Sequence, residues 1–135
     1  MDMRVISTTW APKVLSVLRI VTGFLFIQHG TQKLLAFPVP PPNGQPALMS
    51  LNGVGGMLEL FGSALLILGL FTRPVAFVLS GFMAVAYFMA HAPQGFWTIV
   101  NHGELAALYS FVFLYFFVAG GGEWSLDRQI RSTPV

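Results

Sequence analysis

Charge is what this chain has least of, and the shortage limits where the chain can fold. Asp, Glu, Lys and Arg make up 9% of its 135 residues, against about 25% in a typical soluble domain. Hydrophobic residues make up 55%, and the mean hydropathy is +0.71. A domain of this size hides only about two thirds of its unfolded surface when it folds. The remaining apolar surface predicts membrane lipid as the surrounding medium.

Other absences exclude whole classes of chemistry. The chain has no cysteine, which excludes disulfides, thiolate metal ligands and cysteine nucleophiles. The Lys and Arg residues are scattered and exceed the acids by only two, so no basic stripe indicates a nucleic-acid partner. Arg19 interrupts the first apolar stretch and no small-residue cleavage site follows it. We therefore expect the N-terminal segment to be retained rather than removed as a signal peptide.

Uncharged runs mark the expected membrane spans, because a helix needs about 20 largely apolar residues to cross the bilayer core. Asp, Glu, Lys and Arg are absent from residues 34–58, 60–72, 74–103 and 105–122. We predict helices near 13–36, 53–71, 74–91 and 102–119. The fold expected is all-α, a single-domain integral membrane four-helix bundle over residues 1–135. If the more polar first helix does not cross, three spans remain and the two ends of the chain lie on opposite sides.

Local sequence signals place the ends of these helices. Residues 37–50 are rich in proline, which is excluded from helix interiors, so this segment predicts a loop. Pro74 suits a first helical turn. Asn101 and Glu104 have the spacing of a capping box that opens the last helix. Three consecutive glycines, at 120–122, indicate where that helix ends.

The distribution of basic residues predicts the orientation. Cytoplasmic loops carry an excess of Lys and Arg. With four spans, Lys33 falls on one side, and the other side holds Arg4, Lys13, Arg73, Arg128 and Arg131. We therefore expect both termini to be cytoplasmic.

Small residues recur at intervals of seven in the first two helices. The first helix carries Ser16, Gly23 and Gly30, and the second carries Gly55, Gly62 and Gly69. Seven residues are nearly two turns, so each set forms one narrow stripe. Small stripes let helix backbones approach closely in lipid, and we interpret both as packing surfaces.

Glu59 is the first candidate for a catalytic residue, with His29 as the second. Ionisable groups inside a membrane are costly and tend to serve a function. Glu59 is the only acid well inside a predicted span, and a buried carboxylate must be protonated or paired; by depth, His29 and Lys33 are its candidate partners. Histidine is the side-chain type best suited to proton exchange near neutral pH. The alternative is that these groups only hold helices together.

Five further residues are candidates for substrate binding: Lys33, Arg19, His91, His102 and Glu104. Lys33 and Arg19 have alternatives in snorkelling to the lipid headgroups or in pairing across helices. The other three lie at helix ends, where a surface histidine or a helix cap is the alternative. No pair of histidines lies four residues apart on one helix, so the sequence contains no metal-binding motif, and we predict no metal site.

Four segments, taken in order, resemble the DoxX family, including its CatD-like oxidoreductase branch. They read LRIVTGFLFIQHGTQKL, GGMLELFGSALLILGLFTRPVA, NHGELAALYSF and GGGEWSLDRQI, within residues 14–130. The positions that match the family pattern are Arg19, Gly23, His29, Gly30, Lys33, Glu59, Gly62, Gly69, Asn101, Gly103, Glu104, Ser125 and Asp127. Glu123 stands where the family pattern has a glycine. The resemblance implies a multi-pass protein of the bacterial plasma membrane that is linked to quinone or redox chemistry.

Three functions are consistent with these observations. The first is a quinone- or quinol-linked redox or detoxification subunit, in which His29 and Glu59 exchange protons with the ligand. Its cofactor stays open, with a quinone as the candidate. Because the sequence shows no electron carrier, such a subunit needs a redox partner protein or a homo-oligomer. The second is a non-enzymatic assembly or anchoring subunit, and the third is a small proton-coupled transporter built around the buried acid.

Overall fold

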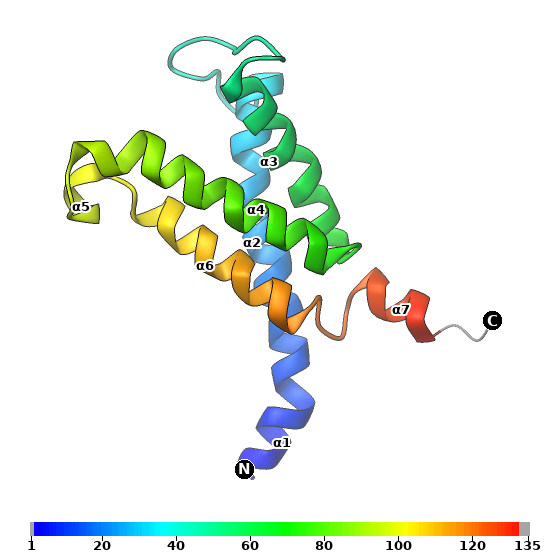
Figure 1. The fold of residues 1–135 in the computed structure, drawn as a ribbon. Helices are drawn as coiled ribbons and strands as arrows, with labels where there is room; N and C mark the ends of the chain where they lie inside the picture. Colours follow the sequence, from blue (N-terminus) through cyan, green and yellow to red (C-terminus); the bar gives the residue numbers. More distant parts are fainter. Residues whose placement is uncertain (1, 133–135) are drawn as a thin grey trace. The chain divides into compact units, whose positions relative to one another are not determined.

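The regular structure is entirely helical in the part of the chain described, residues 2–132 of a computed structural model (Figure 1). This confirms the predicted all-α class for these residues. The N-terminal and middle segments are α1 (Met3–Val5), a π-helical turn (Ile6–Trp10), α2 (Ala11–Leu35), α3 (Leu51–Leu68) and α4 (Thr72–Ala86). A π-helical turn (Tyr87–His91), a 3-10 turn (Ala92–Gln94), α5 (Thr98–Asn101), α6 (Glu104–Ala119) and α7 (Leu126–Ser132) follow.

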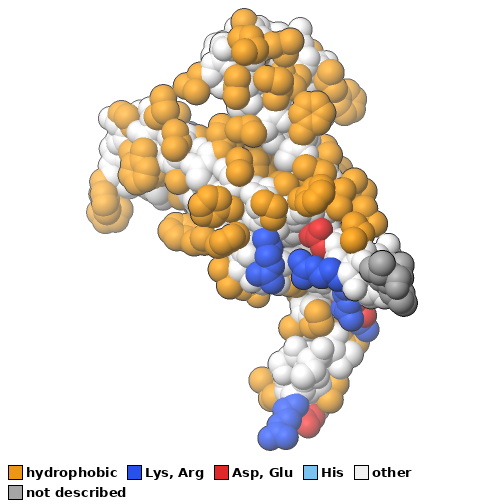
Figure 2. Space-filling view, turned by 45° about the vertical axis from the view of Figure 1, so that its right-hand side comes forward, with side chains coloured by type: hydrophobic (Ala, Val, Ile, Leu, Met, Phe, Trp, Pro, Cys, Tyr) orange, Lys and Arg blue, Asp and Glu red, His pale blue; other side chains and the backbone are white. Residues whose placement is uncertain are grey.

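Three helical stretches of the described chain are long and apolar enough to cross a membrane. They are Met3–Leu35, Leu51–Leu68 and Thr72–Gln94. The fourth predicted span, α6, is apolar but has only 16 residues. Hydrophobic side chains are spread over the visible face, and Lys and Arg side chains gather in its lower part (Figure 2). A helix that exposes apolar side chains outward requires a non-aqueous neighbour, so the expectation of a membrane protein is confirmed.

The described residues group into two compact units. One unit contains residues 2–72 and 121–132, and the other contains residues 73–120. The first unit holds α2, α3 and α7, and the second holds the rest of α4 with α5 and α6.

Within the first unit, α2 and α3 pack closely because glycines on α2 leave room for the α3 backbone. A Cβ atom added at Gly30 would lie 2.5 Å from the Leu60 backbone nitrogen and 2.9 Å from the Gly56 oxygen. One added at Gly23 would lie 2.8 Å from a side-chain carbon of Ile67. The stripe predicted on the first helix is therefore a packing surface at Gly23 and Gly30.

Two members of the predicted stripes have other uses. Ser16 faces the C-terminal segment, where its hydroxyl accepts a hydrogen bond from the Trp124 backbone N–H at 2.9 Å. Gly69 follows the last residue of α3 with a φ of +68°, the left-handed conformation that glycine adopts most readily at a helix C-terminus. The second helix therefore ends three residues before the predicted position 71, because Gly69 ends it.

Other helix boundaries also differ from the predictions. Helical structure begins at Met3 rather than near residue 13. The last long helix begins at Glu104 rather than 102, because His102 takes a left-handed φ of 57°. The Asn101 side chain accepts a hydrogen bond from the Gly103 N–H at 2.8 Å, so it does not form the expected capping box with Glu104. The short helix α7 was not predicted.

Within the second unit, hydrogen bonds join α4 to α6. The Ser80 hydroxyl donates to the Ser110 carbonyl at 2.8 Å, and the Ser110 hydroxyl donates to the Ser80 carbonyl at 2.9 Å. Toward the end of α6, the Arg73 guanidinium donates to the Val118 carbonyl at 2.8 Å. The reciprocal bonds of the two serines satisfy polar groups that lipid cannot hydrogen-bond.

Candidate functional site

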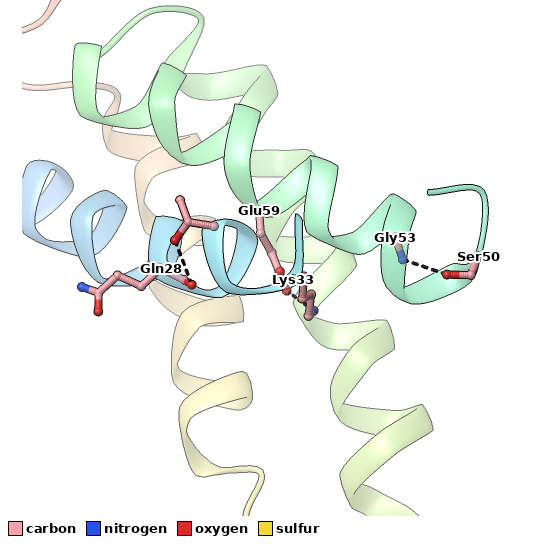
Figure 3. Close-up of polar contacts among 6 residues, drawn as sticks. Gln28, Lys33, Ser50, Gly53 and Glu59 are labelled. Atoms are coloured by element: carbon pink, nitrogen blue, oxygen red, sulfur yellow. Dashed lines mark hydrogen bonds and ion pairs between the residues drawn. The ribbon is translucent and has the colours of Figure 1, made fainter. Parts of the chain in front are cut away.

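A partly buried ion pair joins α2 to α3. The Lys33 ammonium nitrogen lies 2.8 Å from Glu59 Oε1, and the two side chains point toward each other from their helices (Figure 3). The Glu59 side chain is 6% exposed and that of Lys33 is 30% exposed. The structure thus brings together the first predicted catalytic residue and one of the predicted substrate-binding residues.

The helix packing explains why these two side chains meet. A Cβ added at Gly56 would lie 3.2 Å from the Lys33 Cβ. Gly56 precedes Glu59 by one turn, so the absence of a side chain there lets the Lys33 stem lie against α3. A lysine carries its charge on a flexible aliphatic stem, which here reaches along α3 to the carboxylate.

One carboxylate oxygen of Glu59 and the hydroxyl of Ser63 have no hydrogen-bond partner within the described chain. Among the described residues, three buried side-chain atoms have no hydrogen-bond partner: Glu59 Oε2, Ser63 Oγ and Thr72 Oγ1. The first two lie on the same helix. Ser63 follows Glu59 by four residues on α3, so both occupy one helix face. Unsatisfied buried polar atoms are rare because each costs about 1–3 kcal/mol, and more for a charged group. This pair of open atoms is therefore the strongest mark of a ligand site in the first unit.

His29, the second predicted catalytic residue, lies on α2 one turn before Lys33. Residues four apart on a helix are neighbours on its surface, so His29 and Lys33 share a face. The His29 ring lies 6.1 Å from the Phe26 ring, centroid to centroid, and the residue is partly exposed. This position adjoins the ion pair along α2.

Arg19 lies fully buried, toward the other end of α2. Its guanidinium donates to the carbonyls of Gly121 at 2.8 Å, Ile67 at 2.7 Å and Trp124 at 2.6 Å, and also to that of Leu66. The last carbonyls of a helix have no partner within it, and Arg19 supplies one to the end of α3. Arg19 precedes Lys33 by 14 residues, about 21 Å at 1.5 Å per residue. The structure therefore places Arg19 away from the ion pair, where it joins α3 to the C-terminal segment.

Asp127 is an interacting residue that reasoning from the sequence did not select. Its carboxylate accepts hydrogen bonds from the backbone N–H groups of Phe71 at 2.8 Å and Thr72 at 2.9 Å, at the start of α4. Burial raises the pKa of Asp127, but the hydrogen bonds from Thr72 and Phe71 and the nearby charge of Arg131 outweigh it. The net pKa lies below the usual value for an aspartate. The only sequence signal was its match to the family pattern.

A second polar cluster lies in the unit of residues 73–120. The His91 ring nitrogen Nδ1 lies 3.0 Å from the Asn101 carbonyl oxygen. The buried Asn101 amide donates to the Gly95 carbonyl at 2.8 Å and to the Tyr87 hydroxyl at 3.2 Å. Asn101 and Tyr87 were not among the predicted site residues. The family pattern pointed to Asn101, and no sequence signal pointed to Tyr87.

The two remaining predicted residues are exposed. His102 and Glu104 both lie at the surface near the start of α6, so the structure does not join them to the His91–Asn101 cluster. In the described part of the chain, no three His, Asp or Glu side chains lie close enough together to hold a metal ion.

Three apolar helices of membrane-crossing length in the described chain define a multi-pass helical membrane protein, and an ion pair joins two of them. The chain belongs to the DoxX family, whose model matches residues 14–92. The matched range includes Lys33, Glu59 and Ser63.

Two relatives extend this result to most of the chain. An uncharacterized protein of Haemophilus influenzae is 50% identical over 124 residues, which cover 89% of this chain and 92% of the relative. The uncharacterized membrane protein Rv3486 of Mycobacterium tuberculosis is 27% identical over 144 aligned positions, which cover 94% of this chain and 86% of the relative. No solved structure matches at a significant level.

Proposed function

We propose that this chain is a quinone- or quinol-linked redox or detoxification subunit of the bacterial inner membrane. The observation that carries the proposal is the ion pair of Lys33 with the buried Glu59, which leaves Glu59 Oε2 without a hydrogen-bond partner among the described residues. Polar groups at this depth in a span are costly and tend to serve a function. The DoxX resemblance supports the quinone class, and the position of Glu59 beside Lys33 supports Glu59 as a group that exchanges protons with the ligand.

The chemistry assigned to each residue follows from its position. Oxidation of a quinol to a quinone releases two protons and two electrons. Glu59 accepts the proton of one quinol hydroxyl as general base, and Lys33 holds the carboxylate in place through its ion pair. His29, which is partly exposed on the same face of α2 as Lys33, passes this proton outward. The proton of the other hydroxyl is released to water. The electrons go to a redox partner protein, which the proposal includes.

The proposed topology has four spans, with both termini in the cytoplasm. The 16 residues of α6 extend about 24 Å at 1.5 Å per residue, somewhat short of a hydrocarbon core of about 30 Å; local thinning of the bilayer compensates for this difference. Because the chain has no cysteine, single substitutions report the sidedness directly. Asp2→Cys and Ser132→Cys should be labelled only from the cytoplasmic side, and Gln45→Cys only from the outside. Labelling of Asp2→Cys and Ser132→Cys from opposite sides would exclude four spans.

A titration of the purified protein in nanodiscs tests the function. A short-chain ubiquinone and its quinol are the probes, and wild type is compared with Glu59→Gln and His29→Ala. Glu59→Gln should weaken binding of the quinol about tenfold or more, because a hydrogen bond to a charged group contributes about 1.5–3 kcal/mol. Glu123→Gln is the matched control, since this acid is remote from Lys33 in the sequence and lies outside the pair. Absence of binding, or affinities unchanged in both variants, would remove the proposal.

An assembly or anchoring subunit is the second candidate, and the Arg19 network favours it. A buried charge whose every nitrogen donates to a backbone carbonyl acts in folding. If Glu59 acts in the same way, Glu59→Gln should lower stability or partner capture and leave ligand affinity unchanged.

A further inference from the structure

The two open atoms on α3 differ in what they can hydrogen-bond. Glu59 is paired with the Lys33 ammonium group through Oε1, a contact in which the glutamate is the carboxylate partner of an ion pair. Oε2 of an ionised carboxylate only accepts hydrogen bonds, whereas the Ser63 hydroxyl both donates and accepts. A group that satisfies Glu59 must therefore bring a donor.

A single hydroxyl group has both the donor and the acceptor that these two atoms need. Glu59 and Ser63 are four residues apart on α3, a spacing that makes side chains neighbours on one face of a helix. A phenolic hydroxyl placed there donates to Glu59 Oε2 and accepts from the Ser63 hydroxyl. A carbonyl oxygen accepts from Ser63 but has no proton for Glu59, so it leaves the carboxylate unsatisfied and brings a second partial negative charge toward it.

Burial makes this difference large. Ser63 is fully buried and Glu59 is 5% exposed, so bulk water does not compensate for a missing donor. A buried polar group deprived of its partner still bears the cost of desolvation and lacks the hydrogen bond that would offset it. Sites of this kind therefore discriminate strongly against analogues that lack one hydroxyl.

We infer that Glu59 and Ser63 form a hydroxyl-recognition site that selects the reduced form of a quinone-class ligand, the aromatic diol, over the oxidised form. This inference rests on the quinone-linked function proposed above and adds the redox state of the bound ligand. The diol is then held with one hydroxyl proton directed at the carboxylate that is proposed to accept it.

The test compares three ligands with the full-length protein in nanodiscs. The probes are duroquinol, duroquinone and the dimethyl ether of duroquinol, which keeps the ring and oxygens but has no donor. Measurements are anaerobic, and partition into protein-free nanodiscs is subtracted for each probe. We expect wild type to bind the quinol at least tenfold more tightly than either the quinone or the ether.

Two variants separate the contributions of the two side chains. The carboxamide of Glu59→Gln has an N–H donor, so this variant should lose the preference for the quinol and gain affinity for the quinone. Ser63→Ala should weaken quinol binding several-fold and keep the order of preference. Ser110→Ala is the matched control, because that serine already donates to the Ser80 carbonyl; it should leave all three affinities unchanged.

The possible outcomes distinguish this inference from the proposed function. Equal affinities for quinol and quinone, tighter binding of the quinone, or equal affinities for quinol and ether would overturn the redox-state selectivity and leave quinone binding intact. Absence of binding of all three probes would remove the proposed function, and the selectivity with it. The wild-type comparison decides between these results even if a variant fails to fold.

Discussion

Replacing Gly30 with alanine measures how far the Lys33–Glu59 pair depends on the close approach of α2 and α3. The added Cβ would lie 2.5 Å from the Leu60 backbone nitrogen, whereas ordinary van der Waals contact begins at 3.4 Å. The helices must therefore separate by about 0.9 Å at this point, because a helix backbone has no rotamer that relieves the contact. A radial gap of that size forfeits a quarter to a half of the dispersion attraction between facing atoms.

The expected cost has a structural and an electrostatic part. Overpacking of this kind destabilises by about 1–3 kcal/mol, and the backbone clash places Gly30→Ala near the upper end. Lys33 follows Gly30 by one turn, so the same separation moves its stem away from α3, and the side chain must leave its present rotamer to keep the 2.8 Å contact with Glu59, which weakens the pair. Gly30→Ala should therefore lower both stability and quinol affinity.

Reversible unfolding in mixed micelles, with increasing fractions of sodium dodecyl sulfate, measures the loss in the free energy of unfolding. Gly81→Ala is the control, because a Cβ at Gly81 meets no atom within 4 Å. It should unfold at the wild-type detergent fraction or slightly above, since alanine is the better helix former. If Gly30→Ala unfolds together with wild type and Gly81→Ala, the close approach of the helices at Gly30 is refuted.

Two further substitutions test the contacts of the C-terminal segment. Arg19→Lys should unfold at a clearly lower detergent fraction than wild type, by about 3 kcal/mol or more, because an ammonium group cannot donate in the planar fork that reaches four carbonyls; unchanged unfolding would contradict the observed network. Asp127→Asn should cost about 0.5–2 kcal/mol near neutral pH, as the loss of a helix cap does. Because the folded pKa of Asp127 is lowered, its ionised form stabilises the fold above the unfolded pKa, and this contribution is lost as the pH falls through the folded pKa. The unfolding curves of wild type and Asp127→Asn should therefore converge in acid, and a constant difference from neutral to acidic pH would contradict the assignment.

The apolar helices were predictable because their signal is local. Runs without charge define α3, α4 and α6 to within a few residues. The start of the first helix was not predictable, because Pro12 is a residue that normally opens a helix. Here a π-helical turn over Ile6–Trp10 precedes that proline and continues the helix toward the N-terminus. Whether a helix extends past a proline depends on the local backbone geometry, which cannot be predicted from composition.

The ion pair could also be predicted from the sequence, because counting residues along the two helices places Lys33 and Glu59 at similar depth. The acceptors of Arg19 could not be predicted, because they are main-chain carbonyls that no side-chain pattern marks. The same holds for Asp127, whose donors are backbone N–H groups more than 50 residues away in the chain. Contacts from a side chain to a distant main chain depend on the fold as a whole.

The buried charges of Arg19 and Glu59 differ in a way that separates structure from function. Each guanidinium nitrogen of Arg19 donates to a carbonyl, so a ligand that bound there would have to break a bond in order to make one. Glu59 binds Lys33 through one carboxylate oxygen, and its other oxygen has no hydrogen-bond partner in the part of the chain described. A ligand that brings a donor to this oxygen forms a hydrogen bond without breaking one. Because an unmade hydrogen bond in a dry site costs more than a made one contributes, the open oxygen favours any ligand that can fill it. Of these two residues, Glu59 is therefore the one that we expect to bind a ligand. Depth in the membrane alone would not distinguish Glu59 from Arg19.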